Sequence, residues 1–229
     1  MRINKYIAES GFCSRRKADE FIQAGKVIIN GKKANLGDDV DASDKITING
    51  TPITTEGKQD IYIAFNKPIG VISTLDEEAD NSVLDYIDLN ERVFYIGRLD
   101  VASHGLMLLT NNGDVADKIA RSKNDHEKEY VVRINKPMTR SFIDAMRNGI
   151  EIEGQLTKPA KAKKLKDTVF QLIITEGRNR QIRKMCEALG YEVTFLKRTR
   201  FGNVKLGDLG PGNSRMLTKT ERRELLASL

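Results

Sequence analysis

Two short apolar runs on either side of a glycine-bracketed loop constrain this fold more than any other stretch. Val93–Ile96 leads into Gly97-Arg-Leu-Asp-Val-Ala-Ser-His-Gly105, and Leu106–Thr110 leads out. Short apolar runs bounded by turn residues are typical of strands. We therefore expect two core strands whose connecting loop carries Arg98 and Asp100, a place where rigid scaffolds present functional groups. On position alone, the alternative is a tight turn whose Asp accepts hydrogen bonds from its own backbone.

The chain after residue 60 contains many further short apolar runs. Strands are expected at 61–65, 71–74, 131–134, 150–153, 158–165, 168–174 and 191–197. Helices are expected after Asn111-Asn-Gly-Asp114, from Thr139 to Gly149, from Arg178 to Leu189 and after the capping box Thr218–Glu221. Strict alternation of strands and helices is absent, which favours an α+β fold with a mainly antiparallel mixed sheet.

The first 53 residues have a different organisation. Ile3, Tyr6 and Ile7 have helical spacing, and Ser14 is a good N-cap for a second helix that ends near Gly25. Strands 27–29 and 45–48 are each followed by an Asn-Gly turn. Because the polar stretch 54–60 has no apolar periodicity, we interpret it as a linker. The predicted domains are 1–53 and 61–229, joined by 54–60.

Basic residues are concentrated in two parts of a chain whose net charge is only +6. Residues 1–35 carry eight Lys and Arg against three Asp and Glu, and residues 158–205 carry 13 against four. These give net charges of +5 and +9, which favour contact with a polyanion. Arg15 and Arg16 at a helix start oppose the helix dipole, a conflict that a bound anion would remove. Surface pairs with Asp19 and Glu20 are the alternative.

The remaining composition excludes several classes of protein. Cys13 and Cys186 are too few and too far apart for a disulfide framework, and no metal-ligand spacing is found. No Gly-rich nucleotide loop is present, so we expect no cofactor. We also expect no membrane span or signal peptide, and hence a cytoplasmic protein. His104 and His126 have no partner at nucleophile or metal spacing and are expected in loops, where they contact backbone or the polyanionic partner.

Residues 1–31 carry the first resemblance to a known family. Met1-Arg-Ile-Asn-Lys-Tyr-Ile-Ala8, Gly11-Phe-Cys-Ser-Arg-Arg-Lys-Ala-Asp19 and Gly25-Lys-Val-Ile-Ile-Asn-Gly31 together resemble the S4 RNA-binding module, a small α/β domain. This resemblance implies that structured RNA is bound. The implied RNA contacts in this domain are basic residues: Arg2, Lys5, Arg15, Arg16, Lys17, Lys32 and Lys33.

Four motifs of the second domain carry another resemblance. They are Asn66-Lys-Pro-Ile-Gly70, Gly97-Arg-Leu-Asp100 with Ser103-His-Gly-Leu106, Lys128-Glu-Tyr130, and Gly177-Arg-Asn-Arg-Gln-Ile-Arg183. In this order they resemble the RsuA/RluB/RluE/RluF family of pseudouridine synthases. The run Asn124-Asp-His-Glu-Lys-Glu-Tyr130 and the Gly-Arg-Asn-Arg spelling are most similar to the RluF branch, which acts on large-subunit (23S) ribosomal RNA.

The resemblance implies roles for individual residues. Asp100 is implied as the catalytic carboxylate that promotes cleavage of the uridine N1–C1′ bond, by attack on sugar or base or by assisting ribose deprotonation. Tyr130 is implied to stack on the target uracil, which must leave its helix. Arg183 is implied to pair with Asp100 and keep it ionised. Arg98 is implied to fill the gap left by the flipped base or to grip phosphate, and Arg178 and Arg180 to contact RNA.

These expectations define a site-specific rRNA uridine isomerase that acts as a monomer on a structured stem-loop with a flipped uridine. The alternative is a non-catalytic S4-type ribosome-associated factor, which would have the basic surfaces but would not need Asp100, Tyr130 and Arg183 to meet. A methyltransferase would need a cofactor loop, and a glycosidase two facing carboxylates.

Overall fold

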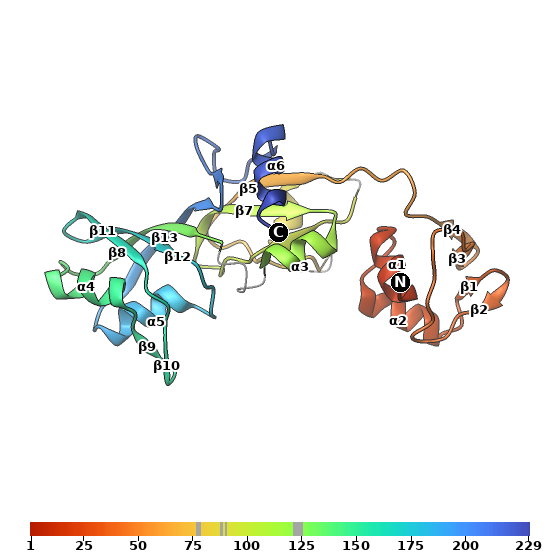
Figure 1. The fold of residues 1–229 in the computed structure, drawn as a ribbon, viewed down its shortest axis with the longest axis horizontal. Coiled ribbons are helices and arrows are strands. Elements are labelled where there is room, and N and C mark those ends of the chain that lie inside the picture. The colour runs from red at the N-terminus through yellow and green to blue at the C-terminus, as the bar shows by residue number, and fades with distance from the viewer. Residues whose placement is uncertain (77–78, 88, 90, 121–125) are drawn as a thin grey trace. The chain divides into compact units, whose positions relative to one another are not determined.

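The computed structural model describes residues 1–76, 79–87, 89, 91–120 and 126–229, which divide into two compact units. The first unit is Met1–Ile61 with Leu89–Val93 and Asn111–Gly113, and the second is the remainder (Figure 1). The predicted domain boundaries at 53 and 61 stay predictions. No helix in the described ranges is both long and apolar enough to cross a bilayer.

The first unit packs two helices against a four-stranded antiparallel sheet of order β2-β1-β3-β4. Ser14 caps the second helix as predicted, because its side chain accepts a hydrogen bond from Lys17 N. Asn30 and Gly31 both have positive φ, as a two-residue hairpin turn requires. The elements are α1 (Ile3–Glu9), α2 (Arg15–Gln23), β1 (Val27–Ile29), β2 (Lys32–Lys33), β3 (Ile46–Ile48) and β4 (Thr51–Ile53).

The second unit is built on a nine-stranded sheet, whose main path runs β11-β12-β8-β13-β7-β5-β15. β14 pairs with β13, and β6 pairs with β7. Among the described pairs only β13–β7 is parallel, so the predicted mixed, mainly antiparallel sheet is confirmed. The strands are β5 (Tyr62–Lys67), β6 (Phe94–Ile96), β7 (His104–Thr110), β8 (Lys128–Ile134), β11 (Lys161–Lys166), β12 (Val169–Ile174), β13 (Val193–Phe201), β14 (Val204–Lys205) and β15 (Ser214–Met216); β9 (Glu151–Ile152) and β10 (Gln155–Leu156) form a separate hairpin.

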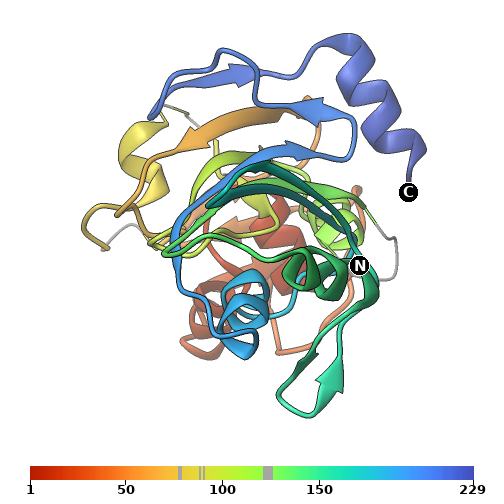
Figure 2. The same cartoon turned by 90° about the vertical axis from the view of Figure 1, so that its left-hand side faces the viewer.

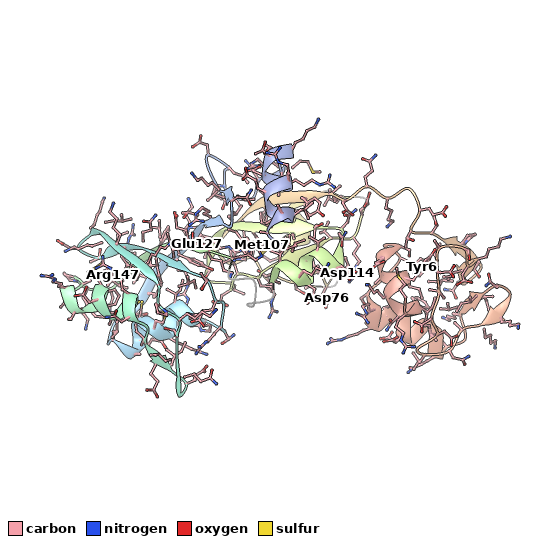
Figure 3. The ribbon with its side chains drawn as sticks, in the orientation of Figure 1. Tyr6, Asp76, Met107, Asp114, Glu127 and Arg147 are labelled. Atoms are coloured by element: carbon pink, nitrogen blue, oxygen red, sulfur yellow. The ribbon has the colours of Figure 1, made fainter. Side chains whose placement is uncertain are left out.

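Helices cover this sheet around two apolar cores (Figure 2). In one core α4 (Arg140–Asn148) and α5 (Gln181–Ala188) pack on β8 and β12, and in the other α3 (Gly113–Ala120) and α6 (Lys219–Ala227) pack on β5 and β7. Arg147 of α4, labelled in Figure 3, donates from Nε to the Ala162 carbonyl of β11 at 3.0 Å. The predicted caps are confirmed: Thr139 caps α4, and Thr218 with Glu221 forms a capping box for α6.

The chain departs from the predictions in several places. The predicted strand 71–74 is wrong: only Ile72 forms an isolated bridge, and a 3₁₀ helix, η1 (Val83–Tyr86), follows. The helix predicted from Arg178 to Leu189 is α5, and it begins only at Gln181. It cannot begin earlier because Arg180 has a left-handed backbone conformation with φ 51°. β5 extends through Lys67 and β13 through Phe201, beyond the predicted ends. The start of the run 124–130 lies outside the described residues.

Candidate active site

The Asp100 loop connects two paired strands of the sheet, β6 and β7, as predicted. Leu99 is buried, whereas the side chains of Arg98 and Asp100 on either side of it are at least partly exposed. Gly105 closes the loop with φ 102°, and a Cβ there would lie 2.3 Å from the carbonyl oxygen of Arg198. Because that contact is with backbone, only glycine lets β7 approach β13 at this point.

One row of paired residues across four neighbouring strands fixes the positions of the side chains around the Asp100 loop. In the strand registers, Lys67 of β5 lies opposite Gly105, Gly105 opposite Arg198 of β13, and Arg198 opposite Tyr130 of β8. Residues opposite each other on neighbouring strands project to the same face of a sheet. The row therefore brings residues from four distant parts of the sequence to the loop that carries Asp100.

Segment 67–73 holds the Asp100 loop from one side through backbone carbonyls. Lys67 Nζ donates to the Ser103 carbonyl at 2.9 Å and to the Val101 carbonyl at 3.5 Å, and also to Pro68 O at 2.9 Å. Gly70 N donates to the Val101 carbonyl, and Ser73 Oγ to the Leu99 carbonyl at 2.6 Å. Lys67 is 0% exposed, and its burial lowers its pKa to about 8, against the attraction of Asp100.

Two arginines hold the loop from the other side. Arg198 is fully buried; its Nε donates to the Leu106 carbonyl at 2.6 Å and its Nη2 to the Gly97 carbonyl at 3.3 Å, so it joins the two ends of the loop. Arg183 donates to the Ala102 carbonyl at 2.9 Å, to Ser103 Oγ at 3.5 Å and, from Nη1, to the Val193 carbonyl at 3.1 Å.

The predicted direct pairing of Arg183 with Asp100 is not formed in the described structure, because the guanidinium donates instead to the Ala102 carbonyl of the loop and to the Val193 carbonyl of β13. Burial lowers the pKa of Arg183, as does neighbouring Arg180, while the charge of Asp100 acts in the opposite direction. The Nε of Arg183 is buried without an acceptor. The two groups thus interact electrostatically, and Arg183 retains a donor that is not used.

Asp100, Tyr130 and Arg183 line one pocket of about 170 Å³. Asp100 comes from the loop before β7, Tyr130 from β8 and Arg183 from α5. Tyr130 is 7% exposed and belongs to the core that contains Leu99. The other functional side chains of the lining are basic: Arg98, Lys128, Arg178, Arg180 and Arg198. Among the described residues of the lining, a single carboxylate therefore stands among cations, an arrangement that suits an anionic or polar substrate.

Lys128 belongs to this lining, and no role was predicted for it. Its Nζ donates to the carbonyls of His126 and Thr175 at 3.0 Å each and lies 5.5 Å from the centre of the Phe201 ring. Its position two residues before Tyr130 on a strand puts both side chains on one face. The two-residue alternation of side chains along a strand was therefore the sequence signal that could have placed Lys128 beside Tyr130.

The segment before α5 is organised by a buried carboxylate, Glu176. It accepts hydrogen bonds from Gln181 Nε2 at 2.6 Å and Lys158 N at 3.0 Å, and it pairs with Arg178 Nε at 3.3 Å. Arg178 also donates to the carbonyls of Gln155 and Leu156. Arg178 is therefore fixed to the β9–β10 hairpin, whereas Arg180 is exposed at the helix start.

The two histidines and the cysteines lie apart from the pocket lining. His104 is the first residue of β7 rather than a loop residue, with its ring 4.4 Å from that of Phe195. His126 is buried just before β8. Burial raises the pKa of Cys186 to about 12, which makes it unreactive. In the described part of the chain, no three metal-binding side chains form a cluster.

The predicted RNA-contacting residues of the first unit differ in how they are held. Arg15, Arg16, Lys32 and Lys33 are exposed on α2 and β2. The alternative pairs of Arg15 and Arg16 with Asp19 and Glu20 are not formed among the described residues. Asp19 accepts from Asn4, and Glu20 pairs with Lys17. Lys5 pairs with Glu9, and Arg2 with Asp39.

Comparison with known proteins defines the class of this chain. The description "RNA pseudouridylate synthase" belongs to the family that matches residues 61–188, and the S4 domain family matches residues 1–46. The chain belongs to the RNA pseudouridine synthase family and carries an S4 domain at its N-terminus.

Individual relatives narrow this class. The chain is 49% identical over 225 residues to the dual-specificity RNA pseudouridine synthase RluF of Salmonella typhi, a match that covers 98% of this chain and 78% of that protein. It is 40% identical over 235 residues to the ribosomal large subunit pseudouridine synthase B of Bacillus subtilis, covering 99% and 96%. A crystal structure of a pseudouridylate synthase superimposes with a TM-score of 0.73 at 32% identity, covering 98% and 99%.

Proposed function

We propose that this protein converts specific uridines of large-subunit ribosomal RNA to pseudouridine, with Asp100 as the catalytic carboxylate. The relatives that support the substrate are named for RNA in general and for the large ribosomal subunit. The observation that carries the proposal is the pocket shared by Asp100, Tyr130 and Arg183. A non-catalytic RNA-binding factor would not need these three groups together.

The pocket residues divide the chemistry among themselves. Asp100 promotes cleavage of the N1–C1′ bond, the freed uracil turns, and a C5–C1′ bond forms. The proton lost from C5 is balanced by one gained at N1, so the isomerisation consumes no oxidant, reductant or group donor. Tyr130 stacks on the uracil, which enters the pocket after leaving its stem-loop. Arg183 orients the loop that carries Asp100, and its unused Nε is the donor through which a direct pair can form when substrate binds.

RNA binding extends beyond the pocket in this proposal. Arg98 and Arg180 face the phosphate backbone or the gap left by the target base, and Arg178 adds fixed positive charge. The basic residues of the S4 domain, 1–53, hold the structured RNA. We propose a monomer, because residues of one chain line the pocket, and a cytoplasmic enzyme, because ribosomal RNA is its substrate.

The test is conversion of unmodified large-subunit ribosomal RNA, followed by mapping of pseudouridine. Wild-type protein is expected to modify one or a very few uridines. Asp100→Asn keeps the shape of the side chain but removes the carboxylate, so activity should fall by at least about 10³-fold while RNA binding is retained. The matched control is Asp208→Asn, which changes an exposed carboxylate outside the pocket. Full activity in Asp100→Asn would refute the mechanism, and an inactive wild type that binds RNA would favour the non-catalytic factor.

A further inference from the structure

A second and larger hollow adjoins the Asp100 pocket. It is an open groove of about 850 Å³. The residues that line both the groove and the pocket are Arg98, Leu99, Asp100, Gly177, Arg178 and Arg180. Because the shared residues include the Asp100 loop itself, anything covalently attached to a nucleoside in the pocket can continue directly into the groove. The groove is therefore placed to receive the next part of a chain-like substrate.

One wall of this groove is apolar and exposed. Ile69, Ile72 and Val101 line it, with 59%, 40% and 46% of their surfaces exposed. Their backbones are fixed, since Gly70 N donates to the Val101 carbonyl at 2.9 Å and Ile72 N to the Asn81 carbonyl at 2.9 Å. Three aliphatic side chains held together in water form a surface that a flat apolar partner would cover favourably.

The rest of the groove is basic and polar. Arg98, Asn179 and Arg180 are exposed there, and Arg178 is half-buried. Among the described residues of the lining, Asp100 is the only carboxylate. Phosphate groups are bound by arginines of this kind. The groove thus combines an apolar wall with a cationic wall, as a nucleotide combines an apolar base face with an anionic phosphate.

We propose that this groove binds the unpaired nucleotide that adjoins the target uridine, with its base against Ile69, Ile72 and Val101 and its phosphate toward Arg98 and Arg180. This inference rests on the proposed function, because it takes the pocket to hold the target uridine. It makes the two isoleucines specificity-determining residues, since a nucleotide paired in a helix cannot present its face to them. The enzyme would then require two unstacked nucleotides in its substrate.

The experiment pairs changes in the protein with changes in the RNA. The variant Ile69→Ser/Ile72→Ser removes two of the three aliphatic side chains of the apolar wall. Leu165→Ser is the matched control, because Leu165 is an aliphatic residue that is 48% exposed outside both hollows. Each protein is given a target stem-loop transcript and two otherwise identical transcripts, with an abasic nucleotide 5′ or 3′ of the target. The measured quantity is kcat/KM for pseudouridine formation.

One of the two abasic transcripts should be converted by wild type roughly 10-fold more slowly, about the value of one apolar contact of this size. The double-serine variant should lose a similar factor on the intact transcript and nothing further on that abasic one, while Leu165→Ser behaves as wild type. Additive losses, or intact activity in the double-serine variant, would overturn the groove proposal. If wild type fails to convert the intact transcript, it is the proposed function that fails instead.

Discussion

The basic residues of the first unit and those around the Asp100 pocket are chemically alike but are held in opposite ways. Arg15, Arg16 and the lysines of β2 are exposed and make no ion pair among the described residues. Lys67 and Arg198 are fully buried and donate to backbone carbonyls. Exposed cations attract a polyanion in a salt-dependent manner, whereas buried ones fix the conformation of a loop. Under the proposed function, one residue class thus serves recognition in one region and preorganisation in the other.

Arg198 gives the largest expected effect on the buried side of this comparison. Arg198→Met leaves the carbonyls of Gly97 and Leu106 without their donor inside the core, which should cost about 2–4 kcal/mol of unfolding free energy. Activity should fall with it, since the two ends of the Asp100 loop are no longer joined. Urea unfolding measures the first effect. Arg140→Met, at a position 97% exposed on α4, is the control, and equal stability of the two variants would contradict the structural role of Arg198.

Arg183→Lys sharpens the comparison because it keeps the charge and removes the planar fork. A lysine cannot reach the carbonyls of Ala102 and Val193 simultaneously from fixed positions, so the Asp100 loop loses alignment. We expect kcat to fall about 10²-fold with a smaller change in KM, as for displacement of a catalytic group by about 1 Å. Steady-state kinetics on a stem-loop transcript measures both. A change confined to KM would instead assign Arg183 to RNA binding.

Lys67 is expected to make the activity of the enzyme depend on pH. Below its pKa of about 8 the ammonium supplies three donors to the carbonyls of Pro68, Val101 and Ser103, and above it the neutral amine supplies two. We therefore expect kcat to fall as pH rises through about 8, and we expect Lys67→Met to be less active and to lack this alkaline limb. A wild-type profile that stays flat to pH 9 would contradict this role.

Stability should respond to Lys67 in the opposite direction. Its pKa is lowered from 10.5 on folding, so between about pH 8 and 10.5 the unfolded chain binds more protons at this group than the native chain. The contribution of this group to the unfolding free energy therefore rises with pH across that window. Comparing wild type with Lys67→Met at pH 7 and pH 10 isolates the contribution. Loss of activity without loss of stability in this window distinguishes loop loosening from global unfolding.

The features that depend on residues close together in the sequence were predicted correctly. Ser14, Thr139 and the Thr218–Glu221 box cap helices where predicted, because a cap depends on residues three positions away. Strand 71–74 was predicted from its apolar character and is absent. There Ser73 bonds the Leu99 carbonyl and Ile72 the Asn81 carbonyl, which are long-range partners that no periodicity reveals.

The candidate site likewise has features that were predicted from the sequence and features that were not. The resemblance of the motifs to pseudouridine synthases implied that Asp100, Tyr130 and Arg183 share a pocket, and they line the same one. The same resemblance implied that Arg183 pairs with Asp100, whereas its guanidinium donates to the carbonyls of Ala102 and Val193. Every residue has a carbonyl, so sequence cannot indicate which carbonyls a buried cation will hold. The burial of Lys67 and Arg198 was missed for the same reason.

Arg15 and Arg16 give the smallest expected effect and test the exposed side of the comparison. Replacing both with Ala removes two unpaired cations from the start of α2, where Ser14 already supplies the cap, so folding should be little changed. When the logarithm of the RNA association constant is plotted against the logarithm of the salt concentration, the slope should become less steep by about 1 to 2. The control Lys45→Ala removes an exposed cation from the acidic part of the same unit. At saturating RNA, kcat should stay at the wild-type value. A fall in kcat would mean that these arginines organise the catalytic pocket, and the distinction between recruiting and preorganising cations would no longer follow burial.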